Sequence, residues 1–288
     1  MDYDFELVPG NSIAKWDAVK YNEASDDINH TREVSPMSGH SKWSTIKRKK
    51  GKADAAKGVV FTKLAREIIV AARAGGGNPE GNFRLRIAIA NAKSANMPND
   101  NIKRAIDKGA GGGEGANYEE LTYEGYGPGG TAVIVKAMTD NRNRTAGEIR
   151  HIFSKNGGNM GETGCVSWMF KEKGFLSVDK EGCKLSADDL MLMALEYGAE
   201  DVLEEDESVI EIITAPETFQ AVKEGMEKDG VVFSEGEITM SPDTSVLVTD
   251  LEQAKYVLRM MEALDDHDDV QNTYTNFDVA DDIAEKLG

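Results

Sequence analysis

The amino-acid sequence predicts a multidomain α+β protein, and three observations support that prediction. The chain has 288 residues, which is more than a single hydrophobic core usually accommodates. Before residue 110 the apolar residues follow the 3.6-residue period of helices, whereas after residue 120 short β-branched runs alternate with short helical runs. Between these regions the glycine-rich stretch GAGGGEGANYEE, residues 109 to 120, predicts a linker.

Charge divides the chain in the same places. Residues 37 to 110 hold 16 Lys+Arg and 5 Asp+Glu, a net charge of +11. Residues 1 to 36 hold 3 Lys+Arg and 8 Asp+Glu, a net charge of −5, and residues 111 to 288 hold 14 Lys+Arg and 38 Asp+Glu, a net charge of −24. The three segments together give the overall net charge of −18. A basic module on an acidic body indicates a polyanionic partner for the module, without distinguishing DNA from RNA.

Residues 1 to 36 form an acidic N-terminal extension with no sustained hydrophobic period, so we expect them to be flexible and to lie outside any core. The sequence has no secretory signal and no apolar run near the roughly 18 residues of a membrane span, so a cytoplasmic protein is predicted. Cys165 and Cys183 form no C-x-x-C pair, so neither a disulfide framework nor a zinc site is expected.

Three helices are predicted next. The first carries an apolar face from Lys57 onward and stops at Gly75-Gly76-Gly77; its face consists of Phe61, Leu64, Ala65, Ile68, Ile69 and Ala72. The second begins near Asn82 and ends before Pro98, and it buries Leu85, Ala88, Ile89 and Ala92. The third begins after Asn99, buries Ile102, Ala105 and Ile106, and ends at Gly109. They predict a small helical bundle.

The acidic part of the chain then alternates between strands and helices. Strand, helix and strand are predicted at residues 131 to 138, 145 to 153 and 164 to 170. Helix, strand, helix and strand follow at 187 to 195, 209 to 213, 218 to 226 and 231 to 233. The chain ends with a strand at 245 to 249, a helix at 251 to 264 and a strand at 270 to 277. Such short alternating elements are typical of small α+β domains.

The densest chemical signal is the basic segment GHSKWSTIKRKKGKADAAKG, residues 39 to 58. Its seven cations would repel one another without a counter-charge, which favours a polyanion site: Lys42, Lys47, Arg48, Lys49, Lys50, Lys52 and Lys57. Trp43 either stacks on an unpaired base or anchors this arm to the bundle. Lys63 and Arg66 continue the positive charge on the first helix, and Arg84 and Arg86 flank the apolar face of the second.

Enzymatic and cofactor sites are not predicted. Gly125 to Gly130 matches G-x-G-x-x-G, but a strand follows it, and Thr131 stands where a P-loop has its lysine, so a tight turn is expected instead of nucleotide binding. The acidic run from Asp265 to Asp269 is interpreted as a solvated turn, and no metal is assigned to it. The four histidines belong to no hydrolase motif, so no cofactor, small-molecule substrate or catalytic residue is expected.

Several long motifs resemble the YebC family: GHSKW (39 to 43), FTKLAREI (61 to 68), ANMPNDNIKRAI (95 to 106), YEGYGPGG (123 to 130) and TDNRNRTAGEIRHIFSK (139 to 155). The resemblance runs from Met37 to the end. It implies a basic helical domain (37 to 112) followed by two ferredoxin-like α+β domains, the last inserted in the middle one. The middle domain would comprise residues 113 to 180 plus 245 to 288, and the insert residues 181 to 244.

The resemblance also implies a function. Members of the family are described as DNA-binding transcriptional regulators, and others, including mitochondrial relatives, as translation activators that help the ribosome past difficult stretches. Our prediction is a non-enzymatic, ribosome-associated translation factor that contacts rRNA and relieves stalling; the alternative is a DNA-binding transcriptional regulator, and the third, weakest hypothesis is a nucleotide-dependent enzyme. Lys47 to Lys50, Lys63 and Arg66 would be the main contacts. Arg142 and Arg144 are either a second contact or exposed arginines beside a capped turn. The sequence shows no symmetric dimer seam, which is compatible with a monomer.

Overall fold

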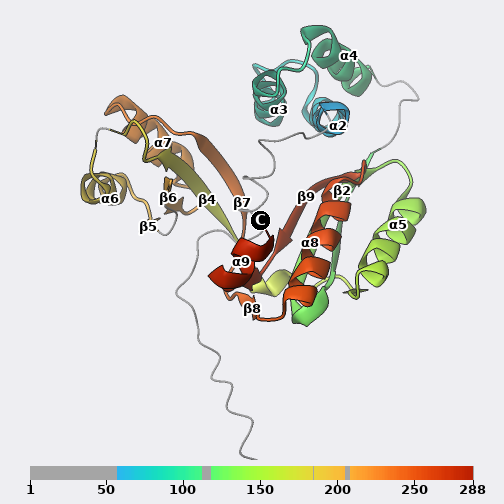
Figure 1. The fold of residues 1–288 in the computed structure, drawn as a ribbon. Coiled ribbons are helices and arrows are strands. Elements are labelled where there is room, and N and C mark those ends of the chain that lie inside the picture. Colours follow the sequence, from blue (N-terminus) through green and yellow to red (C-terminus); the bar gives the residue numbers. More distant parts are fainter. Residues whose placement is uncertain (1–56, 112–117, 184, 205–207, 288) are drawn as a thin grey trace, which may run out of the picture. The chain divides into compact units, whose positions relative to one another are not determined.

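The computed structural model describes residues 57–111, 118–183, 185–204 and 208–287 (Figure 1). Predictions for the N-terminal extension, the basic arm before residue 57 and the centre of the linker therefore lie outside the described residues. The α+β fold class predicted from the sequence is confirmed. Within the described ranges, no helix combines the length and the apolar character needed to cross a membrane.

The basic module contains the three predicted helices, α2 (Lys57–Gly75), α3 (Phe83–Ser94) and α4 (Asn99–Ala110). Their core is formed mainly by Ile68, Ile69, Ala71, Ala72, Leu85, Ala88, Ala92, Ile102 and Ala105. Small residues let the helices approach closely: a Cβ added at Gly109 of α4 would lie 2.5 Å from the carbonyl oxygen of Ile69 in α2. The helical period in the sequence therefore identified the buried face correctly.

The first α+β domain is built on a four-stranded antiparallel sheet with the order β3-β1-β2-β9. Its elements are β1 (Glu119–Tyr126), β2 (Ala132–Thr139), α5 (Arg142–Lys155), β3 (Asn159–Met160), α8 (Leu251–Asp265) and β9 (Val270–Thr275). Helices α5 and α8 cover one face of this sheet (Figure 1), where Ile149, Phe153, Val257 and Met261 pack against Val133 and Val135. A short parallel pair, β8 (Val246–Val248) with β10 (Phe277–Val279), and helix α9 (Asp281–Leu287) complete it.

The second α+β domain has the element order βαββαβ and a sheet in the order β5-β6-β4-β7. Its elements are β4 (Phe170–Asp179), α6 (Ala187–Glu196), β5 (Asp201–Leu203), β6 (Val209–Thr214), α7 (Phe219–Lys228) and β7 (Glu235–Pro242). Leu190 of α6 and Met226 of α7 share one core with Leu176 and Ile212 of the sheet. The chain leaves the first sheet after β3 and rejoins it at β9, so this domain is an insertion.

The position of β4 differs from the predicted domain boundary. The sequence prediction assigned residues up to 180 to the middle domain. Strand β4 pairs with β6 and β7, so residues 170–179 belong to the sheet of the insert. The sequence obscured this strand because the charged run KEKG separates Phe170 from the apolar second half of the strand.

Two predicted strands were wrong. No strand occupies residues 231 to 233; Val231 instead packs into the core of the insert directly after α7, and the strand begins at Glu235. Residues 164 to 170 were also predicted as a strand, but Gly164 has a φ of 89° and residues Ser167–Met169 form a 3-10 turn. In both places a buried valine, Val166 or Val231, packs into a core from a loop, whereas Trp168 and Val232 are exposed.

A buried carboxylate shapes the loop that replaces the second of these strands. Glu124 of β1 is 3% exposed, and its carboxylate accepts three backbone N–H groups, from Gly164 (2.7 Å), Val166 (2.8 Å) and Ser167 (2.7 Å). Burial alone would raise the pKa of Glu124, but the three N–H donors outweigh it and hold the pKa below its usual value. The Trp168 indole N–H donates to the carbonyl oxygen of Cys165 at 3.1 Å, while its ring stays 70% exposed.

The glycine loop forms the tight turn that the sequence predicts. Residues Pro128–Gly130 make one 3-10 turn, in which Gly129 and Gly130 have φ angles of 71° and 77°. Strand β2 follows at Ala132, so the loop lacks the helix N-terminus on which a dinucleotide phosphate would rest.

Candidate nucleic-acid interface

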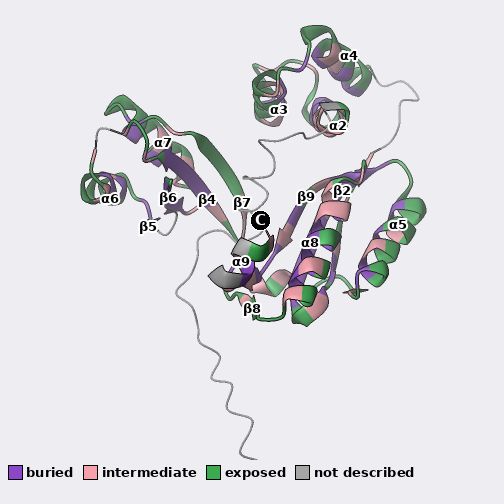
Figure 2. Cartoon of the chain, in the orientation of Figure 1, coloured by how far each residue is buried: buried purple, intermediate pink, exposed green. Residues whose placement is uncertain are grey.

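The described part of the basic module has most of its cations on its surface. Residues 57–111 contain 10 Lys+Arg and 4 Asp+Glu, a net charge of +6. Exposed positions of α3 and α4 are green in Figure 2. The exposed cations come from all three helices: Arg73, Arg86, Lys93, Lys103, Arg104 and Lys108. Such a cationic surface favours contact with phosphate groups.

Half of the predicted contact residues lie outside the described ranges. They are the cations and the tryptophan of the basic arm: Lys42, Trp43, Lys47, Arg48, Lys49, Lys50 and Lys52. Lys57 begins α2, and the structure describes its backbone only. For these eight residues the polyanion contact stays a prediction.

Lys63 and Arg66 of α2 are engaged with the turn that follows α8. The Lys63 ammonium donates to the carbonyl oxygen of Asp265, and the Arg66 guanidinium donates to that of Asp268. Arg66 also forms an ion pair of 3.0 Å with the Asp269 carboxylate, and its side chain is only 13% exposed. A phosphate that reached Arg66 would therefore compete with an existing carboxylate partner.

Asp269 is the centre of this cluster. Its Oδ2 accepts from the Thr145 hydroxyl (2.6 Å), the Thr139 hydroxyl (3.1 Å) and the Arg144 guanidinium (2.8 Å). Burial opposes ionisation, but these donors and Arg66 hold the pKa of Asp269 below its usual value. The acidic run does form a turn between α8 and β9, yet Asp269 is 2% exposed, so the solvated turn expected from the sequence is wrong at this residue.

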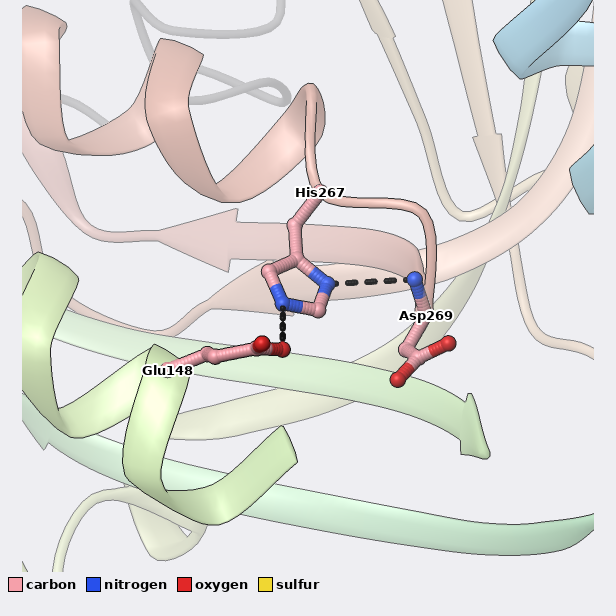
Figure 3. A group of neighbouring side chains, drawn as sticks. All are labelled: Glu148, His267 and Asp269. Carbon is pink, nitrogen blue, oxygen red and sulfur yellow. Dashed lines mark hydrogen bonds and ion pairs between the residues drawn. The ribbon is translucent and has the colours of Figure 1, made fainter. Parts of the chain in front are cut away.

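His267, Glu148 and Asp269 lie close enough together for a metal site to be considered (Figure 3). Both imidazole nitrogens already have partners: Nε2 lies 2.9 Å from the Glu148 carboxylate, and Nδ1 accepts the backbone N–H of Asp269 at 3.1 Å. The Asp269 carboxylate is taken up by the donors described above. A cation would have to displace these bonds, so the arrangement is better explained as a link between α5 and the α8–β9 turn.

Arg142 and Arg144 differ in their surroundings. Asn141 caps α5, since its side-chain oxygen accepts the backbone N–H of Arg144 at 3.1 Å. Arg144 pairs with Asp140 (3.1 Å) and Asp269 (2.8 Å), and these carboxylates raise its pKa, Asp269 most strongly. Arg142 is exposed at the start of the helix. Of the two arginines, Arg142 is the more accessible to an anionic partner.

A similar contrast separates the two predicted arginines of α3. The Arg84 guanidinium lies 2.7 Å from the Glu120 carboxylate and 2.8 Å from that of Glu67, and these bonds raise its pKa further above its usual range. Arg86 is exposed, and its guanidinium lies over the Phe83 ring, 5.6 Å from the centroid. Within the described ranges Arg86 forms no ion pair, so its charge is available.

Family models match both parts of this architecture. The model of the TACO1/YebC protein N-terminal domain matches residues 41–112, and the model of the TACO1/YebC second and third domain matches residues 118–277. The chain belongs to the TACO1/YebC family. Residues 1 to 40 lie outside both matches.

Curated relatives in the TACO1/YebC family are similar over nearly their whole length. A "Probable transcriptional regulatory protein" of Desulfitobacterium hafniense is 62% identical over 250 residues, which cover 87% of this chain and 99% of the relative. One of Pelotomaculum thermopropionicum with the same name is 59% identical over 245 residues, 85% and 100% of the two chains. The crystal structure of a conserved hypothetical protein from Aquifex aeolicus matches with a TM-score of 0.73 and 51% identity, covering 84% and 98%. The names of these curated relatives indicate a regulator of gene expression.

Sequence reasoning missed two features of this TACO1/YebC surface. Phe83 was not assigned to any site, although it stands directly after the helix-capping Asn82 and off the apolar period of α3. Asp269 was interpreted within an acidic run, where no pattern distinguished it from its neighbours. Of the two residues, only Phe83 could have been found from the sequence, because it is an apolar residue outside the apolar period of its helix.

Proposed function

We propose that this protein is a nucleic-acid-binding regulator of gene expression that acts on translation at the ribosome, in the cytoplasm, with the basic module on rRNA. The observation that carries the proposal is the charge division: +11 in residues 37 to 110 against −24 in residues 111 to 288. A long uniform duplex would attract the module and repel the rest, although charges beyond a Debye length of about 8 Å are largely screened.

The inserted domain strengthens the argument for a mixed partner. Residues 170–242 hold 6 Lys+Arg and 19 Asp+Glu, a net charge of −13. A ribosome presents both rRNA and basic proteins, so the module and the acidic domains would each gain complementary contacts there. In this proposal the basic domain (37 to 112) binds rRNA, and the α+β domain and its insert orient it on the ribosome. The sheet pairing bounds the insert at residues 170 and 242.

The second candidate is a DNA-binding transcriptional regulator, which the names of the curated relatives favour. Phosphate contacts position a protein on either polymer and carry no sequence information, so the cations of the module are compatible with both candidates.

One experiment separates them. The protein is crosslinked in growing cells, ribosomes are separated on a gradient at moderate salt, and the attached DNA and RNA are sequenced in parallel. We expect the protein in ribosomal fractions with reproducible rRNA crosslinks. A control at high salt should release it, because phosphate contacts weaken with salt. Absence from ribosomal fractions together with discrete promoter peaks would refute the translational role and support the transcriptional one.

A further inference from the structure

Helix α3 has a second, outward face that the core does not use. Asn82 fixes the start of the helix: its side-chain amide donates to the carbonyl oxygens of Ala71 (2.7 Å) and Gly76 (2.8 Å), and its side-chain oxygen accepts the N–H of Leu85 at 3.0 Å. Leu85, Ala88 and Ala92 then point into the bundle. The helix is therefore held in one rotation about its axis, and its opposite face is a defined surface.

That opposite face is apolar where a solvated face would be polar. Phe83 is 68% exposed and Ile87 45% exposed, and with the exposed Ala90 they recur at the i, i+4, i+7 spacing of one helix face; Arg86 stands on the same face at i+3. Scattered exposed apolar residues are common, but an apolar stripe with helical spacing, opposite the core, marks an interaction surface. This stripe is called the α3 outer face below.

The charged residues of α3 itself are all positive. The helix sequence FRLRIAIANAKS contains no Asp or Glu. Arg86 lies over the Phe83 ring, and Lys93 is exposed two turns further along, whereas Arg84 on the flank is neutralised by Glu120 and Glu67. The α3 outer face therefore combines an exposed aromatic ring with two cations of the same helix, and α3 itself contributes no carboxylate, which fits an anionic partner with flat apolar groups.

We propose that the α3 outer face is a stacking contact for unpaired nucleotides of RNA, with a base on the Phe83 ring and phosphates at Arg86 and Lys93. This contact rests on the proposed function of the basic module. Unpaired bases stack on aromatic rings, whereas bases inside a duplex already stack on one another and offer Phe83 no face. An acidic protein partner would also meet the cations, and the test distinguishes it.

The test uses the full chain and two fluorescent probes, an oligoadenylate of roughly twelve nucleotides and the same strand paired with oligouridylate, a length within the range of single-strand sites. Binding is followed by anisotropy at several salt concentrations. We expect Phe83→Ala to weaken single-strand binding roughly tenfold, since one base loses its stacking partner, and to change duplex binding by less than about twofold. Phe83→Leu keeps the apolar bulk and should be almost as weak as Phe83→Ala.

The variants Arg86→Ala and Arg84→Ala are compared as a matched test of the phosphate contact. Arg86→Ala should lower the salt slope by about one phosphate contact, and Arg84→Ala should leave the slope unchanged, because the charge of Arg84 is already compensated. Leu192→Ala, which removes a 64% exposed side chain on α6, serves as the control and should bind like the parent. Thermal unfolding checks that each variant is folded.

Three results would overturn the proposal. Parent-like binding by Phe83→Leu would show an apolar contact without stacking, and equal losses on both probes would show that unpaired bases are not preferred. Parent-like RNA binding by Phe83→Ala with loss of ribosome association would identify a protein partner for this face. A parent chain that binds neither probe would instead refute the proposed function, and the stacking contact with it.

Discussion

Replacing Glu124 by Gln tests whether one buried carboxylate holds the loop of residues 164–169. The carboxylate accepts three backbone N–H groups from this loop and is 3% exposed. A glutamine side chain has nearly the same shape but carries one acceptor oxygen and one NH2 group. Its oxygen can retain Val166 and Ser167, which share Oε2, while its NH2 group would face the N–H of Gly164.

The expected cost follows from these bonds. A hydrogen bond to a charged group contributes about 1.5–3 kcal/mol and a neutral one about 1 kcal/mol, so losing one bond and the charge on two others removes about 3–5 kcal/mol. Burying a neutral amide costs less free energy than burying a carboxylate, and this difference offsets part of the lost hydrogen-bond energy. We expect a net loss of about 3 kcal/mol in the stability of the loop.

Hydrogen exchange at the backbone amides of Val166 and Ser167 measures this loss directly, because it reports local opening. A change of about 3 kcal/mol corresponds to exchange roughly a hundredfold faster. Glu162→Gln is the matched control: it removes an exposed carboxylate from the same segment and should leave both amides unchanged.

The pH dependence of hydrogen exchange provides a second test of the same reasoning. The pKa of Glu124 is lower in the folded protein than its usual value, so its stabilising effect is present above the unfolded pKa of about 4.3 and disappears as the pH falls through the lower folded value. Glutamine does not titrate, so the difference between parent and variant should shrink below about pH 4. Exchange that is unchanged at neutral pH, or a difference that persists undiminished in acid, would refute the reasoning.

Two further predictions concern the N-terminal part of the sequence. Changing Lys47, Arg48, Lys49 and Lys50 together to Glu should abolish polyanion binding with little change in melting temperature; the parent, if it makes about six phosphate contacts, should lose roughly a thousandfold in affinity between about 50 and 200 mM salt. Salt-insensitive binding by the parent, or an unaffected variant, would remove this segment from the mechanism. A chain that starts at Met37 should keep the melting temperature and the affinity of the full chain, because residues 1 to 40 lie outside both family matches. A large loss in either quantity would show that the extension is integral to the protein.

The sequence predicted the elements whose apolar residues are periodic and close together. Helices α2, α3 and α4 were predicted with their buried faces because each core-facing residue has its partners three or four positions away. The strand β4 and the loop at 164–169 were not recovered from the sequence. Their conformations depend on pairing with β6 and β7 and on the distant Glu124 carboxylate, and no local pattern reports such partners.

For the candidate interface, too, one part could be predicted from the sequence and another part depends on the tertiary structure. The sequence by itself determined that residues 37 to 110 are strongly basic and that the rest of the chain is acidic, since charge adds along the chain without regard to folding. The tertiary structure decided which cations are still available. Arg84 meets Glu120, and Arg66 meets Asp269, across 36 and more than 200 positions of sequence, whereas Arg86 lies beside Phe83 on an outward face. Because ion pairing depends on distance in space, neighbouring arginines with the same sequence context acquire different roles only when the chain folds.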